Sequence, residues 1–412
     1  MPPVAERFLR YVRIDTQSDP ASLTTPSTEK QKDLGRLLVD ELQALGLSDA
    51  IMDDHGYVFA TIPPPDGSPA DLPVLALLAH VDTSPDAPGA GVTPIVHPDY
   101  DGGVLALPGD PTVTLDPARQ PALLRHVGET LITSDGTTLL GSDDKAGVAL
   151  LMQLADDLRT DDTPRPPIRL CFTVDEEIGR GVDKLDLEVL GADVAYTLDG
   201  SGVDTISLET FNAASALITV HGVMVHPGYA KGTMVNAVRI LAEIIAALPA
   251  HEAPETTDGQ EGYLHPHALP AGDPTQATVE LILRDFTTEG MARRQALLAA
   301  IVDTARLRHP GATIDLRIEA QYKNMRAYIE DTDPRVATFA FAAAETVGLT
   351  LNEERVRGGT DGARLSELGL PTPNIFNGGY DYHSCFEWNT VQNLERALVY
   401  TKALIHYWGA EG

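Results

Sequence analysis

Basic residues are scarce in this chain: 30 lysines and arginines stand against 60 aspartates and glutamates in 412 residues, for a net charge of −30. A surface with this charge repels a phosphate backbone and an anionic membrane, so we expect neither nucleic acid nor a membrane as a partner. Cysteine is scarcer still, with only Cys171 and Cys385. Two cysteines, one of them in an apolar segment, do not indicate a disulfide framework, and a reducing compartment is expected.

Long apolar runs are also missing. No segment offers the roughly 18 consecutive apolar residues that cross a bilayer. The N-terminus, MPPVAERFLRYVRIDTQSDP, has charges among its apolar positions and lacks the apolar core and cleavage site of a signal peptide. We therefore expect a soluble, cytoplasmic protein.

The chain does have enough apolar residues, 43% of the total, for a large core, and its length favours two domains. Uninterrupted apolar segments at 74–83 and 194–200 predict strands that are covered on both faces. Helical spacing of leucines predicts a helix that ends at Gly46, with Thr28 and Gln31 as a capping box at its start. The patterns predict an α/β domain with a mixed, mostly parallel sheet flanked by helices.

The stretch CFTVDEEIGRG at 171–181 is the main indication of a functional site. It is an apolar strand that ends in three adjacent carboxylates and a glycine turn. Adjacent acids at the end of a buried strand repel one another, so we expect a positive partner, and a metal ion fits best. In such a centre one carboxylate, here Glu177, holds the ion, while another, Glu176, takes a proton from water. The alternative is that the acidic triplet is only a solvated turn, which is the usual role of an isolated triplet of this kind.

Further candidate ligands follow other predicted elements. His80 and Asp82 end one strand, Asp143 begins a helix, and Asp199 ends another strand. Taken alone, each of these residues has a purely structural explanation. Acids at the start of a helix cap free amides, and a HisXaaAsp pattern is only weak evidence for a functional site. Because sites in open α/β sheets form beyond the carboxyl ends of strands, these side chains can converge. Mixed histidine and carboxylate ligands suit zinc, cobalt or manganese.

The pattern changes near residue 212. Alternating strands interleaved with helices near 234–248 and 288–308 predict an inserted α+β domain at 212–323. The remainder, 1–211 and 324–412, forms the predicted catalytic domain, and its Pro- and Gly-rich segment 84–140 is expected to be a loop region that shapes the rim of the site. His383, in an aromatic and glycine-rich loop, completes the candidate ligands.

Ten sequence segments, taken in their order along the chain, resemble those of a known family. They are HVDTSPD, LLGSDDKAG, FTVDEEIG, YTLDG, VHPGYAKGTMVNA, HEAPETTDGQEGY, LILRDF, YKNMR, RGGTDGARLS and NGGYDYH. Together they resemble the peptidase T family, the tripeptide aminopeptidases among the co-catalytic two-zinc peptidases. The likeness runs nearly end to end, and the later strings are similar to peptidase T in particular.

The resemblance implies a ligand set. His80 and Asp199 would hold one zinc ion, Glu177 and His383 the other, and the Asp143 carboxylate would bridge the two. Cobalt or manganese are possible substitutes. Short peptides are the implied substrates, and a homodimer is a possible assembly.

It also implies catalytic and substrate-binding residues. Glu176 would be the general base, and Asp82 would orient the neighbouring zinc-binding histidine. His226, in the inserted lid domain, would stabilise the oxyanion, although a structural turn histidine is the alternative. Arg284 and Arg357 match positions that bind the carboxylate of the substrate.

Some features leave alternatives open. After His383 this chain has the sequence SerCysPheGlu, where the family often has glycine and histidine before the glutamate. Cys385 is a soft potential ligand, although packing is its expected role. The Asp143–Asp144 peptide is implied to be cis. A related dipeptidase or N-acyl amino acid amidohydrolase would use the same metals, and a non-catalytic metal-binding protein is the alternative of another class.

Overall fold

The computed structural model describes residues 1–270 and 272–412, and this part of the chain divides into two compact units. The first unit comprises Met1–Leu208, Ala327–Glu354 and Thr360–Gly412, and the second comprises Glu209–Arg326 and Arg355–Gly359. The predicted inserted domain at 212–323 stays a prediction, because compactness alone does not show that a segment folds by itself. Among the described residues, no helix has the length and apolar character needed to cross a membrane.

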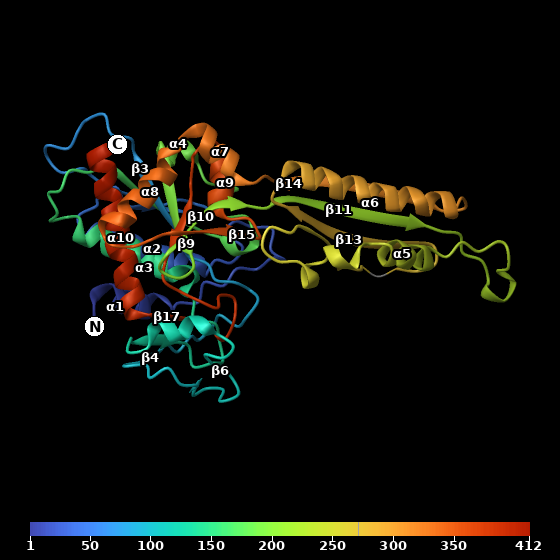
Figure 1. Cartoon of the computed structure of the whole chain (residues 1–412), viewed down its shortest axis with the longest axis horizontal. Helices are drawn as coiled ribbons and strands as arrows, with labels where there is room; N and C mark the ends of the chain where they lie inside the picture. The colour runs from blue at the N-terminus through green and yellow to red at the C-terminus, as the bar shows by residue number, and fades with distance from the viewer. Residues whose placement is uncertain (271) are drawn as a thin grey trace. The chain divides into compact units, whose positions relative to one another are not determined.

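The first unit is built on an eight-stranded mixed sheet (Figure 1). Its strands lie in the order β1 (Ile51–Met52), β2 (Val58–Ile62), β8 (Ile168–Thr173), β3 (Leu75–His80), β9 (Val194–Gly200), β16 (Asn374–Phe376), β10 (Thr205–Thr210) and β15 (Asn352–Val356). The central pairs β3–β8, β3–β9 and β9–β16 are parallel, whereas β1–β2, β2–β8 and β10–β16 are antiparallel. The predicted mixed α/β fold is confirmed, and the parallel pairs lie at the centre of the sheet.

Helices accompany this sheet, and one of them reaches deep into the unit. The helices are α1 (Pro3–Tyr11), α2 (Gln31–Ala44), α3 (Ser142–Asp157), α4 (Leu187–Leu190), α7 (Met325–Thr332), α8 (Arg335–Thr346), α9 (Asp361–Glu367) and α10 (Val391–Glu411). Every residue of α3 from 144 to 155 is buried, and the helix contacts β3, α1 and α10. Its acidic N-terminus therefore lies inside the unit, beside the strand that ends at His80.

The segment 84–140 differs from the expected loop. It contributes β4 (Ile95–His97) and β7 (Leu131–Thr133) to a three-stranded sheet with β17 (Trp388–Thr390), and β5 (Leu105–Ala106) pairs with β6 (Thr114–Leu115). His126, which lies in this segment, is buried against the rings of Tyr380 and Trp388. Strands of two or three residues are too short to show a period, which explains why the pattern missed them.

The second unit is an antiparallel sheet with two helices. The strands lie in the order β12 (Tyr263–Ala268), β13 (Gln276–Asp285), β11 (Asn212–His221) and β14 (Thr313–Tyr322). Helices α5 (Ala237–Ala246) and α6 (Thr288–Arg308) contact each other and the sheet. Buried and partly exposed residues alternate along β13, as expected for a sheet that is covered on one face. The predicted strands and helices of this region are confirmed.

Candidate metal centre

The acidic triplet after β8 is divided between different partners. Asp175, at φ 59°, accepts hydrogen bonds from the backbone nitrogen and hydroxyl of Ser27 and from Nε2 of Gln31. Gln31 Oε1 in turn accepts from the backbone nitrogen of Asp175 at 3.1 Å. The predicted Thr28–Gln31 capping box is therefore wrong, because the Gln31 side chain binds the acidic turn and α2 begins without a side-chain cap. With its carboxylate occupied in this way, Asp175 serves the turn rather than an ion.

Asp82 holds the other two acids and a histidine. Its Oδ1 accepts from the backbone nitrogen of Glu176 at 3.0 Å, and its Oδ2 accepts from that of Glu177 at 3.2 Å. Oδ1 also lies 3.3 Å from His80 Nδ1. Asp82 is fully buried, so one carboxylate fixes both the histidine ring and the turn that carries the glutamates. Spacing in the sequence carried no signal for the two amide contacts.

Asp143 lies between two histidines that are far apart in the sequence. Its Oδ1 is 2.9 Å from His80 Nε2, and its Oδ2 is 3.2 Å from His383 Nε2. Because each carboxylate oxygen faces a different ring, this one group can serve two adjacent cation positions. The Asp143–Asp144 peptide bond is cis, as the resemblance implied.

Around His80 a first group of ligand atoms gathers. His80 Nε2 lies 3.5 Å from Asp199 Oδ1, and atoms of His80, Asp144 and Asp199 all lie within 4.8 Å of one another. The Asp144 carboxylate already accepts from the backbone nitrogens of His80 and Gly147 and from Asn377 Nδ2, at 2.9 to 3.2 Å. We therefore interpret Asp144, to which the sequence assigned no role, as a residue that positions His80.

Around Glu177 a second group forms. His383 Nε2 lies 2.8 Å from Glu177 Oε2, and atoms of His80, Asp143 and Glu177 lie within 4.8 Å of one another. Glu177 Oε1 is buried and has no hydrogen-bond partner among the described residues. A buried carboxylate oxygen without a partner is costly, and a cation would satisfy it. Imidazole and carboxylate donors around one shared carboxylate fit two metal ions.

Several side chains of this cluster have pKa values far from the ordinary ones. Burial raises the pKa of Glu177 to about 8 and that of Asp199 to about 6, and the Asp143 carboxylate adds to both shifts. Although burial opposes it, hydrogen bonds from His383 and His80 lower the pKa of Asp143. Contacts with Asp143 and Glu177 raise the pKa of His383 to about 11. The metal-free cluster thus retains protons that bound cations would displace.

Glu176 lies beside these groups without belonging to either. Its Oε1 accepts a hydrogen bond from the backbone nitrogen of Asp361 at 3.3 Å. Burial, followed by the nearby Asp199 carboxylate, raises its pKa well above the ordinary value. A carboxyl group with a raised pKa next to the candidate ligands is suited to accept and return a proton.

The loop after His383 contributes a residue that sequence reasoning gave no role. The buried Glu387 carboxylate accepts from the backbone nitrogens of Leu140 and Gly141, both at 2.8 Å, and from that of Asp143 at 2.9 Å. Cys385, the soft potential ligand, is partly exposed and belongs to neither ligand group among the described residues.

Two predicted site residues lie at opposite ends of the second unit's sheet. Arg284 pairs with Ala213 at one end of β11, whereas His226 follows the other end, where the strand stops at His221. Figure 1 shows the loop after β11 continuing beyond the strand. The eight steps from Ala213 to His221 span about 27 Å at the usual rise, whereas an extended tripeptide spans about 10 Å. One peptide therefore cannot contact both residues of a single chain.

Arg357 is already engaged within the second unit. Its Nη1 donates to the carbonyl oxygens of Gly259 and Glu261, both at 2.9 Å, and its Nη2 donates to Thr257. The guanidinium also lies over the ring of Tyr263. In this arrangement both terminal nitrogens of Arg357 hold the 257–261 segment, and among the described residues Nε alone has no hydrogen-bond partner.

Comparisons with known proteins show which family the chain belongs to. Residues 208–310 match the family model of the peptidase dimerisation domain. Peptidase T of Geobacillus kaustophilus (strain HTA426) is 43% identical over 393 residues, which cover 95% of each chain. Two crystal structures share the fold: aminopeptidase PepT from Bacillus cereus ATCC 10987 (TM-score 0.76, 24% identity, 98% of each chain) and a tripeptidase from Staphylococcus aureus subsp. aureus Mu50 (TM-score 0.77, 22% identity, 99% of this chain and 98% of that one). The family resemblance seen in the sequence is confirmed: the chain belongs to the peptidase T family.

Proposed function

We propose that this chain is a tripeptide aminopeptidase that uses two zinc ions to release the N-terminal residue of its substrate. One observation carries the proposal. Asp143 offers one carboxylate oxygen to His80 and the other to His383, and each histidine has an acidic neighbour of its own, Asp199 or Glu177. Membership in the peptidase T family supports the reaction and the substrate class.

In this proposal each ion has two ligands of its own and shares a third. His80 and Asp199 would hold one ion, Glu177 and His383 would hold the other, and Asp143 would contact both. Zinc is proposed because it favours imidazole and carboxylate ligands, and cobalt or manganese could replace it. When bound, the two ions would supply positive charge that lowers the pKa of the attacking water and polarises the scissile carbonyl.

Glu176 moves the proton. It accepts a proton from the attacking water and then returns it to the leaving amine, because its pKa is raised while it stays outside the ligand groups. Asp82 keeps the Glu176 carboxyl in place through the backbone amides of the turn and orients His80 at the same time.

Residues of the second unit recognise the peptide. Only Nη1 of Arg284 donates to described residues, so Nε and Nη2 can pair with the carboxylate of the substrate. Arg357 supports the same end of the sheet, since it lies over Tyr263, which pairs with Arg284. His226 stabilises the oxyanion. The region 212–323 would serve as lid and dimerisation domain, with 1–211 and 324–412 as the catalytic domain.

The separation of Arg284 from His226 supports the participation of a second copy of the chain. Because one peptide cannot reach both residues of one chain, we propose a homodimer in which His226 acts on the substrate held by the partner. The match to a peptidase dimerisation domain supports this assembly.

A complementation experiment tests the shared site. Glu176→Gln and His226→Ala should each be nearly inactive alone, and co-refolded mixtures should recover about a quarter of wild-type activity, because half of the dimers are mixed and each mixed dimer has one complete site. If His226 acts within its own chain, no mixture regains activity.

Substrate length tests the reaction itself. Zinc-loaded protein should release the N-terminal residue from a free tripeptide in preference to a dipeptide, a tetrapeptide and the N-acetylated tripeptide, because reading both ends of the peptide measures their separation. Preference for the dipeptide would indicate a related dipeptidase, and preference for the acetylated peptide would indicate an N-acyl amidohydrolase. No hydrolysis of any of the four would indicate a non-catalytic metal-binding protein.

A further inference from the structure

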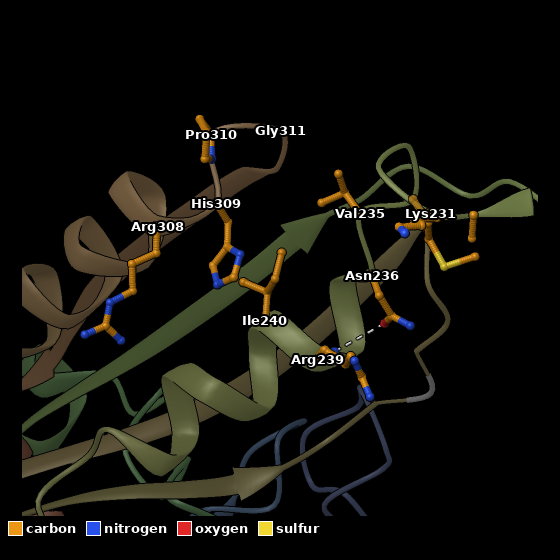
Figure 2. A pocket seen from close by; sticks show the side chains of 11 residues that line it. Lys231, Val235, Asn236, Arg239, Ile240, Arg308, His309, Pro310 and Gly311 are labelled. Atoms are coloured by element: carbon orange, nitrogen blue, oxygen red, sulfur yellow. Dashed lines mark hydrogen bonds between the residues drawn. The ribbon is translucent and has the colours of Figure 1, made fainter. Parts of the chain in front are cut away.

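A cavity of about 770 Å³ lies in the second unit, between the start of α5 and the end of α6 (Figure 2). Its lining includes the basic side chains of Lys231, Arg239 and Arg308, the imidazole of His309, and no acidic residue. This composition is the reverse of the chain as a whole, which has twice as many acids as bases. We call this site the α5–α6 cavity.

Two of the basic groups are paired with an acidic residue that is not part of the lining. Glu243, which is not part of the lining, pairs with Arg308 and with His309 Nε2, both at 2.8 Å. The turn after α6 closes against the opposite wall at Gly311, where a Cβ atom would lie only 3.0 Å from Val235. The two walls of the cavity are therefore in contact.

The other two basic groups are available to a ligand. Among the residues that the structure describes, none forms an ion pair or hydrogen bond with the side-chain nitrogens of Lys231 or Arg239. Asn236 Oδ1 accepts from the backbone nitrogen of Arg239 at 3.2 Å, which fixes the amide and leaves its Nδ2 as a donor (Figure 2). The cavity thus offers an ammonium, a guanidinium and an amide donor beside the apolar side chains of Val235 and Ile240.

We propose that the α5–α6 cavity binds the carboxyl-terminal end of a short peptide. The carboxylate would pair with Lys231, Arg239 and the Asn236 amide, and an apolar terminal side chain would contact Val235 and Ile240. The volume is that of a small-ligand site. On a surface with a net charge of −30, cations without a described partner are also where the carboxylate of a peptide is least repelled.

This site is separate from the predicted carboxylate contact at Arg284. The turn at Gly311 leads into Thr313, which pairs with His221, so the cavity lies at the end of β11 opposite to Arg284. The inference rests on the proposed function in one respect, that short peptides are the compounds this protein handles.

The test measures binding of trileucine and of trileucine amide by calorimetry to the full-length chain in its metal-free form, so that the peptide is not consumed. The variant is Lys231→Ala/Arg239→Ala. The control is Arg36→Ala/Lys184→Ala, which removes two exposed charges from the first unit and leaves the same net charge.

We expect the Lys231→Ala/Arg239→Ala variant to bind trileucine about 10-fold more weakly than wild type, since two exposed charge pairs are lost, and to bind the amide as wild type does. Unchanged affinity for trileucine, an equal loss for acid and amide, or an equal loss in the control would each overturn the proposal. Hydrolysis of trileucine by the zinc-loaded wild type tests the proposed function separately.

Discussion

Glu387 connects the loop of His383 to the backbone of Asp143, so Glu387→Gln should weaken metal binding without unfolding the protein. The carboxylate accepts three backbone N–H groups, two at Oε2 and one at Oε1. A glutamine amide can keep its oxygen where two donors meet, but its NH₂ group then faces the Asp143 nitrogen. One buried N–H loses its acceptor, which costs about 1–3 kcal/mol.

This cost should appear in metal affinity, because the freed backbone is that of the proposed bridging ligand. Loss of a group that orients a metal ligand typically lowers affinity about 10- to 100-fold, and we expect a change in this range. The assay titrates metal-free protein with zinc against a competing chelator, with urea unfolding as a parallel measure of stability.

Glu129→Gln is the matched control. Glu129 is also largely buried and accepts hydrogen bonds from His126, Thr390 and Arg396, but it does not contact Asp143. The Glu129→Gln substitution should lower the stability of the protein and leave its zinc affinity unchanged. A Glu387→Gln protein that binds zinc as tightly as wild type, or a control that weakens zinc binding equally, would refute the reasoning.

Three further predictions concern the same unit. Glu176→Gln should retain two metal ions by elemental analysis but lose about 10²- to 10⁴-fold in turnover, and near-normal turnover would remove it as the base. Metal-free protein should become less stable between about pH 5 and pH 8: burial raises the pKa of Glu177 to about 8 and of Asp361 to about 7, and carboxylate contacts raise that of His383 to about 11. The folded state therefore holds extra protons. The stability that these protons provide is fully present below the pKa values of the unfolded chain and is lost as pH rises through the pKa values of the folded protein. Urea midpoints that rise with pH would contradict this. Gly181→Ala should lower the free energy of unfolding by about 1–3 kcal/mol, because the new methyl group would overlap the buried Asp361 carboxylate, and a wild-type unfolding midpoint would show that the loop adjusts.

The convergence of candidate ligands was predictable because it follows from strand direction. β8 and β9 both run parallel to β3, so the acids that follow these strands reach the same edge of the sheet as His80. Apolar strands that end in charged residues are visible in the sequence, and so is a histidine in a glycine-rich loop. Neither observation needs knowledge of tertiary contacts.

The supporting contacts could not be predicted in this way. Glu387 and Asp144 act on backbone amides, and an amide carries no residue-specific signal. The Gln31 side chain was assigned to its own helix because a local pattern fitted, but its actual partner, Asp175, is 144 residues away. Such tertiary contacts override local capping preferences, and a single sequence does not reveal them.

The order in which the ligands appear along the chain has a consequence for synthesis on the ribosome. Asp143 is 63 residues from His80 but 240 residues from His383. At about 5–20 residues per second, roughly 12 to 48 s pass between translation of Asp143 and of His383. During that interval Glu177 still lacks His383, and the acids at the start of α3 still lack Asn377 and Glu387. Neither of the two proposed metal positions is therefore complete before the C-terminal segment of the chain emerges.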